Sequence, residues 1–171
     1  MEFFEVLGKR QSIRAYSERP VEEEALHRIL EAAHSAPSAG NLQARDIFIV
    51  REPERRAALA RAAFGQDFIA AAPVSLVFCT HPARCTWKYG NRGRRLYAVQ
   101  DATIACAYAM LAATALGLST VWVGAFADSA VHEAVGSPAG LDPVAVLPIG
   151  YAAENPTRRP RLPFEDVVHE I

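Results

Sequence analysis

The sequence predicts one α+β domain over residues 1–171, built as a three-layer α-β-α sandwich around a mixed central sheet. Its 171 residues are a usual length for one domain with a substantial core. Apolar residues make up 51% of the chain and charged residues 22%, which are ordinary globular proportions. Short apolar runs typical of strands are interspersed with segments of helical periodicity, and helices packed outside a sheet give a layered sandwich.

The first third of the chain predicts two helices, a turn and a strand. A short helix covers the apolar residues after position 3 and ends near Gly8. A second helix begins after Pro20, because three glutamates stand in its first turn, where the macrodipole favours acidic groups. It ends before Pro37, and a turn of small residues follows. The apolar run 47–50 indicates a buried strand.

The middle of the chain predicts a helix over 53–63 with its arginines outward, followed by a strand over 73–80. Residues 81–93 are polar and contain one proline and two glycines, which predicts a loop or a mobile lid. The longest helix is expected over 94–116.

The last third predicts a central strand over 120–124, a short helix over 128–135 and a final core strand over 144–149. Residues 151–171 are rich in proline and arginine and only weakly periodic, which is typical of a linker-like tail.

Bulk properties exclude several classes of protein. The net charge of −1 argues against a nucleic-acid partner, and three cysteines without a Cys-x-x-Cys pair argue against a disulfide scaffold. Residues 102–127 carry no charge, but they are rich in Ala, Thr and Ser and interrupted by Gly117. They therefore predict a buried helix and strand, with no membrane partner. The N-terminus lacks a signal-peptide pattern, so a cytoplasmic location is expected.

Three separated segments carry groups that suit one phosphorylated, planar ligand. Residues 10–14 (Arg-Gln-Ser-Ile-Arg) supply two guanidiniums, whose planar forks suit phosphate oxygens, and a hydroxyl. Residues 37–43 (Pro-Ser-Ala-Gly-Asn-Leu-Gln) form a turn where backbone can approach a flat ring. Residues 158–163 (Arg-Arg-Pro-Arg-Leu-Pro) add a second basic cluster. Taken singly, the first segment is better interpreted as a helix exit with solvated charges, and the second is equally compatible with an ordinary loop between a helix and a strand.

In that order, the segments resemble the nitroreductase family of FMN-dependent oxidoreductases. The resemblance covers nearly the whole chain and includes residues 117–126 (Gly-Leu-Ser-Thr-Val-Trp-Val-Gly-Ala-Phe) and 147–151 (Leu-Pro-Ile-Gly-Tyr). The chain is similar to a compact member without the helical insertions that larger relatives place over the flavin. The resemblance implies a nitroreductase-like fold and a homodimer in which the arm 151–171 is exchanged and adds to the sheet of the other subunit.

The resemblance also implies a flavin site shared by two subunits. The phosphate and ribityl chain of FMN would contact residues 10–12 and a basic pair near the C-terminus, Arg159 and Arg161. Because Arg158 is also basic, the alignment of that pair could shift by one position. Arg14 would lie beside the pyrimidine edge and stabilise negative charge on the reduced ring. The turn would come from the second subunit, and residues 122–125 would face N5 and O4. The implied cofactor-binding residues are Arg10, Gln11, Ser12, Arg14, Pro37, Ser38, Ala39, Asn41, Gln43, Val123, Gly124, Ala125, Arg159 and Arg161.

The function implied is an FMN-dependent oxidoreductase that passes a hydride from NAD(P)H through flavin N5 to a nitroaromatic, quinone or similar organic acceptor. No catalytic side chain is expected, because the cofactor carries the chemistry. NADH or NADPH would visit transiently, which fits the absence of a Gly-x-Gly-x-x-Gly fingerprint. The alternative is a flavin-binding dimer with little turnover that acts in cofactor handling or regulation.

Two further groups of residues invite other functions. Cys79, His81 and Cys85 supply only three potential metal ligands, and cysteine is commonly a small buried apolar residue, so no metal site is predicted. The aromatic and basic residues between Trp87 and Arg95 are also compatible with nucleic-acid stacking. Because the net charge is near zero, we interpret this stretch as a lid or a dimer surface.

Overall fold

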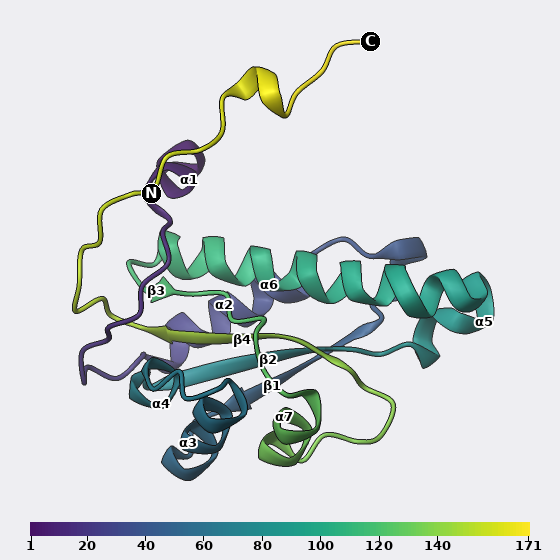
Figure 1. The fold of residues 1–171 in the computed structure, drawn as a ribbon, viewed down its shortest axis with the longest axis horizontal. Helices are drawn as coiled ribbons and strands as arrows, with labels where there is room; N and C mark the ends of the chain where they lie inside the picture. The colour runs from purple at the N-terminus through teal and green to yellow at the C-terminus, as the bar shows by residue number, and fades with distance from the viewer.

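The computed structural model describes residues 1–171 and contains a four-stranded sheet between two layers of helices (Figure 1). In chain order the elements are α1 (Phe3–Lys9), α2 (Glu23–Ser35), η1 (Ala39–Asn41), β1 (Arg45–Val50), α3 (Pro53–Ala62), α4 (Phe68–Ala71), β2 (Val74–Thr80), α5 (Ala83–Arg92), η2 (Gly93–Tyr97), α6 (Ala98–Ala115), β3 (Ser119–Thr120), α7 (Asp128–Val135), β4 (Pro143–Gly150) and η3 (Phe164–Asp166).

The strands pair in the order β1-β2-β4-β3, and each named pair is antiparallel. The only parallel pairing is a bridge between Ser12 and Thr120 at the β3 edge. The mixed character expected of the sheet is therefore confined to that bridge, which attaches the segment after α1 to the sheet.

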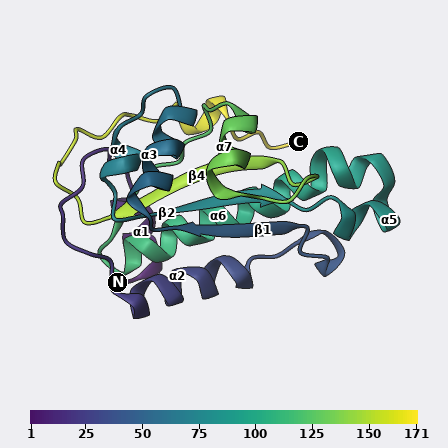
Figure 2. The same ribbon diagram turned by 90° about the horizontal axis from the view of Figure 1, so that it is seen from below.

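Alternation along the two central strands divides the interior into two cores, because successive side chains of a strand point to opposite faces. In β2, Leu76 and Phe78 belong to the core beneath α2 and α6, whereas Val77 and Cys79 belong to the core beneath α3 and α7. Figure 1 shows α6 on one side of the strands and α3 and α7 on the other, and Figure 2 shows the sheet from the side of α3 and α7. The expected three-layer α-β-α sandwich is confirmed.

The long helical stretch from Ala83 to Ala115 is long and apolar enough, by length and composition alone, to cross a membrane. In the structure its α6 part packs against α2 and against β2 and β4. Small residues such as Ala102, Ala105 and Ala109 are fully buried on the packed side and let the helix approach its neighbours closely. The α6 part therefore takes the place of a core helix, as the sequence predicted.

Most helices and strands lie where the sequence predicted them, with two corrections and one omission. Residues 81–93 are not a loop, because α5 begins directly after Pro82 and continues to Arg92. The expected central strand over 120–124 is wrong, since β3 has two residues and lies at the edge of the sheet. The short helix α4 had no counterpart among the expected elements.

The physical reason for the α5 error is the position of its proline and glycines. Pro82 precedes the helix with φ −58°, a value that fits a helix start, and the missing N–H is not needed there. Gly90 takes φ 55° and ψ −141°, so it bends the helix without ending it. A π-helical turn, η2, then joins α5 to α6.

The segment after α1 pairs with the segment after β4. Tyr16 bridges Ala152, and the tail then runs back toward the end of α1 (Figure 1). Arg158 donates hydrogen bonds to the carbonyls of Gly8, Leu7 (3.3 Å) and Arg10 (3.4 Å). From Arg158 to the C-terminus every side chain is exposed, and the tail ends away from the sheet.

Candidate functional site

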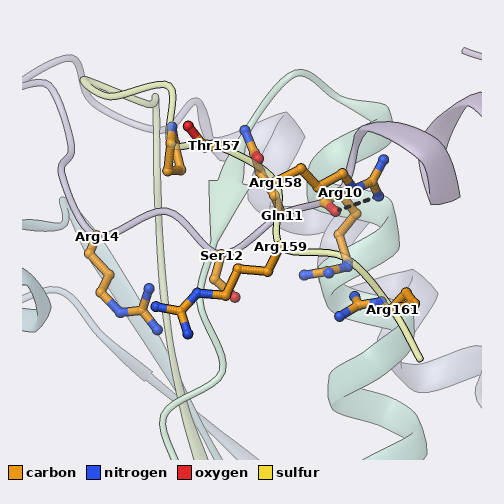
Figure 3. A pocket seen from close by; sticks show the side chains of 9 residues that line it. Arg10, Gln11, Ser12, Arg14, Thr157, Arg158, Arg159 and Arg161 are labelled. Atoms are coloured by element: carbon orange, nitrogen blue, oxygen red, sulfur yellow. Dashed lines mark hydrogen bonds between the residues drawn. The ribbon is translucent and has the colours of Figure 1, made fainter.

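A cavity of about 510 Å³ lies where the segment after α1 meets the C-terminal tail. Figure 3 shows that its lining comes from both ends of the chain. The residues that line it carry five guanidiniums and no carboxylate: Arg10, Gln11, Ser12, Arg14, Pro156, Thr157, Arg158, Arg159 and Arg161. Such a set of donors favours a ligand with several negatively charged oxygens.

The segment 10–14 is extended and fixed on both sides by backbone pairing. The Ile13 N–H donates to the Thr120 carbonyl at 3.1 Å, which attaches the segment to β3. On its other side, the Ala153 N–H donates to the Ala15 carbonyl at 2.9 Å, and the Glu154 carboxylate accepts from the Arg14 N–H. Because Ile13 is buried, its neighbours Ser12 and Arg14 point to the opposite side, toward the cavity (Figure 3).

The arginines of the cavity divide into two groups. Arg158 turns to the backbone carbonyls near α1 and so fixes the tail. Figure 3 shows Arg10 beside Arg161, and Arg14 facing Arg159. The pKa of Arg10 is lowered mainly by burial and further by the cations of Arg161 and Arg158, so like charges face each other without a compensating anion. A bound anion would relieve this repulsion.

Gln11 has a different environment from its neighbours. Its side-chain Nε2 lies 3.5 Å from Oδ1 of Asn155 at the rim, so the structure pairs this amide with the tail.

The turn 37–43 is shaped by three residues with positive φ: Gly40 (59°), Asn41 (57°) and Gln43 (50°). The hydroxyl of Ser38 accepts from the Gln43 N–H at 3.0 Å and closes the turn. Pro37, Gly40 and Asn41 are exposed, and Ser38, Ala39 and Gln43 are half-buried. The turn therefore presents an accessible surface of small and amide side chains.

Asp101 holds this turn from α6, and sequence reasoning missed it. The carboxylate is 1% exposed and accepts from the N–H groups of Ala39 and Ala44, each at 3.0 Å. Arg45 lies nearby, and its Nη2 donates to the carbonyls at the end of α2. The pKa of Arg45 is lowered mainly by burial, while Asp101 opposes that shift. The signal in the sequence was an acidic residue at the start of an otherwise uncharged helix.

The arginine cavity and the turn lie at opposite ends of the sheet. Ser12 bridges Thr120, which pairs with Ile149 and through it with Val74 at the start of β2. The turn leads into Arg45, which pairs with Thr80 at the other end of β2. Six residue steps along β2, from Val74 to Thr80, separate these rows, which corresponds to roughly 20 Å. One copy of the chain therefore does not bring the two groups of predicted residues together.

Residues 123–125 lie along the β3 edge of the sheet. Val123 is buried and bridges Val146, whereas Gly124 and Ala125 are exposed. The side chain of Gln66 donates to the Ala125 carbonyl at 3.2 Å and to the Ala63 carbonyl at 2.9 Å. Gln66 is thus a second polar side chain beside the predicted site that the sequence did not single out.

The three cysteines are free thiols, and all of them are buried. No group of three or more His, Cys, Asp or Glu side chains is close enough to hold a metal ion. Burial, the largest cause, raises the pKa of the Cys79 thiol to about 12 and also raises that of Cys85. The His81 ring is engaged instead by Asp46, with Nδ1 2.7 Å from Oδ2.

Comparison with known proteins gives consistent matches over the whole chain. The family model described as nitroreductase family matches residues 7–66 and 60–151. A Bacillus subtilis (strain 168) protein named FMN reductase NAD(P)H is 35% identical over 99% of this chain and 73% of its own length. A Thermus thermophilus protein named NADH dehydrogenase is 35% identical over 94% of this chain and 91% of its own length.

A solved structure of similar shape is the NADPH:FMN oxidoreductase of Vibrio harveyi in complex with NAD+. It superposes with a TM-score of 0.90 at 29% identity, over 98% of this chain and 76% of that one. The similarity therefore extends to the arrangement of the sheet, its helices and both ends of the chain.

Proposed function

Because the chain belongs to the nitroreductase family, we propose that it is an FMN-dependent NAD(P)H oxidoreductase. Residues 1–171 would form a single flavin-binding domain with 151–171 as its C-terminal arm. The observation that carries this proposal is the arginine cavity, whose lining contains five guanidiniums, one serine hydroxyl and no carboxylate. This set of donors fits the phosphate of FMN, the one group of that cofactor that carries a full negative charge.

Within the cavity, we assign the FMN phosphate to Arg10, Arg159 and Arg161, with Ser12 toward the ribityl chain. Arg158 is set apart because its guanidinium is hydrogen-bonded to backbone carbonyls. Gln11 lies at the rim beside Asn155 and would orient the segment through its backbone.

The flavin ring would extend from the phosphate along the β3 edge. Arg14 would lie at its pyrimidine side, where a cation stabilises negative charge on the reduced ring. The backbone of Val123, Gly124 and Ala125 would face N5 and O4, and the exposed small residues leave space for the ring.

FMN supplies the chemistry when bound: it takes a hydride from NAD(P)H at N5 and passes it to a nitroaromatic, quinone or similar organic acceptor. The chain contributes binding, orientation and electrostatics, and solvent supplies protons. The alternative of a flavin-binding dimer with little turnover is not favoured, because the relatives named above are reductases and dehydrogenases.

We further propose a homodimer in which each flavin site uses both subunits. Since the turn lies roughly 20 Å along β2 from the row of Ser12, Pro37, Ser38, Ala39, Asn41 and Gln43 would reach the flavin of the partner. Two surfaces suit such an assembly. The outer side of α6 exposes Val99 and Tyr108, and the tail exposes Leu162, Phe164 and Val167. Tail and helix would be covered in an isologous dimer with exchanged arms. The cytoplasm remains the expected location.

The phosphate assignment is tested by comparing FMN with riboflavin, which lacks the phosphate. Arg10→Ala or Arg161→Ala is expected to weaken FMN binding by about 1.5–3 kcal/mol, the usual worth of a hydrogen bond to a charged group. Riboflavin, titrated by fluorescence quenching, is expected to bind each variant as it binds the wild type. Equal losses for the two flavins would mean that these arginines support the fold and do not hold the phosphate. A wild-type protein that binds no FMN would contradict the function itself.

A further inference from the structure

The helical stretch from Ala83 to Gln100 carries positive charge that the flavin site does not use. It contains five basic side chains and no carboxylate: Arg84, Lys88, Arg92, Arg94 and Arg95. Only Arg84 forms an ion pair, with its Nη2 2.8 Å from Oδ1 of Asp46. The other four are exposed. A surface of this kind attracts an anionic ligand, although the whole chain has a net charge of −1.

This basic stretch packs directly on the turn 37–43. The Lys88 ammonium lies 2.9 Å, and the Tyr89 hydroxyl 2.5 Å, from the position that a Cβ on Gly40 would occupy. Arg84 donates to the Gln43 carbonyl at 3.0 Å. In the proposed dimer the turn borders the flavin of the partner, so α5 would border the space that a visiting substrate enters. This step rests on the proposed function.

The extended shape of a nicotinamide dinucleotide indicates which of its two ends would reach α5. Its nicotinamide must lie on the flavin ring for hydride transfer, so its adenosine end extends over a neighbouring surface. α5 provides that surface with an exposed indole, Trp87 (74% exposed), next to Lys88. Bases stack readily on such aromatic side chains. A net charge near zero makes a nucleic-acid strand a poorer fit to the same residues.

We propose that Lys88 and Arg92 bind the 2′-phosphate of NADPH and make NADPH the preferred donor over NADH. The two dinucleotides differ only in this group, which is a hydroxyl in NADH. A phosphate monoester carries about −1.5 to −2 charges near neutral pH. Arg92 is pre-oriented, because its Nε donates to the Tyr97 hydroxyl at 3.0 Å and its other guanidinium nitrogens remain without a partner.

The kinetic test uses the FMN-loaded protein and single variants Lys88→Ala and Arg92→Ala. Rapid-mixing reduction by NADPH is expected to show a half-saturating concentration roughly tenfold higher, as when one charge-assisted hydrogen bond to phosphate is lost. Reduction by NADH is expected to stay as in the wild type. Arg28→Ala is the matched control, because Arg28 is an exposed cation on α2 without an ion pair or hydrogen bond. An equal change for both donors, or no change, would overturn the assignment.

A binding test needs no flavin chemistry. Adenosine 2′,5′-bisphosphate is expected to bind the wild type more tightly than adenosine 5′-monophosphate in calorimetry, and to lose that advantage in both variants. Equal affinity of the two probes for the wild type would refute the phosphate site. A wild type that prefers the bisphosphate but whose flavin neither donor reduces would contradict the proposed function and leave the phosphate site supported.

Discussion

The buried carboxylate of Asp101 gives the most direct test of how the turn is held. The substitution Asp101→Asn keeps the size of the side chain and removes its charge. In the native protein the two carboxylate oxygens accept one hydrogen bond each, from the Ala39 and Ala44 N–H groups at 3.0 Å. An amide can accept only one of them, because its NH₂ group would face the second N–H.

The expected loss follows from these two contacts. One hydrogen bond to a charged group, worth about 1.5–3 kcal/mol, is removed. The N–H left unpaired is costly if it is that of Ala44, which is fully buried, whereas Ala39 is half-buried. Because both effects describe the same lost contact, they are not fully additive, and we expect a loss of roughly 2–4 kcal/mol.

Urea unfolding of the flavin-free protein at one fixed protein concentration measures this loss, since the stability of the proposed dimer would depend on concentration. Gln100→Ala is the control, because Gln100 precedes Asp101 on the same helix and is exposed. If Asp101→Asn lowered the free energy of unfolding by less than about 0.5 kcal/mol, the usual size of the effect of a surface substitution, the carboxylate would not be what fixes the turn.

Two other predictions concern the chain ends. Arg158→Ala removes the hydrogen bonds that tie the tail to α1, so a chymotrypsin-type protease should cleave faster after Phe164; an unchanged rate would show that other contacts fix the tail. Hydrogen bonds from Tyr151 and then Arg19 lower the pKa of Glu22 from its ordinary 4.5 to about 2. A lowered pKa contributes stability above pH 4.5 that is lost as the pH falls toward 2, so Glu22→Gln should flatten the acid side of the stability profile. Wild-type and variant profiles of equal slope would contradict this.

The sequence predicted the elements whose signals are local. The apolar run of β2, the acidic first turn of α2 and the glycine after α6 each gave a boundary within a few residues. Gly117 indeed has φ 78°, a conformation in which glycine commonly ends a helix.

The errors arose where distant contacts decide the outcome. The run 120–124 has the residue types of a strand, but after Thr120 it leaves β4 and returns only at Val123, so tertiary packing overrides propensity. Asp101 could not be assigned from a pattern either, since its partners are 62 and 57 residues away. The sequence grouped the two basic segments by their composition. Only the fold shows that the Arg158 guanidinium donates to backbone carbonyls, whereas the Arg161 guanidinium faces the cavity.

The separation of the cavity from the turn leads to a last prediction, about mixed dimers. Arg161→Ala damages the cavity half of a site and Asn41→Ala the turn half, so each variant alone should bind FMN poorly. In a mixed dimer, the intact cavity of one chain meets the intact turn of the other, and one of its two sites is whole. Random pairing after joint refolding makes half the dimers mixed, so FMN-binding capacity should return to about a quarter of the wild-type value. If both groups served a flavin within one chain, mixing would recover nothing, and the titration would stay at the level of the separate variants.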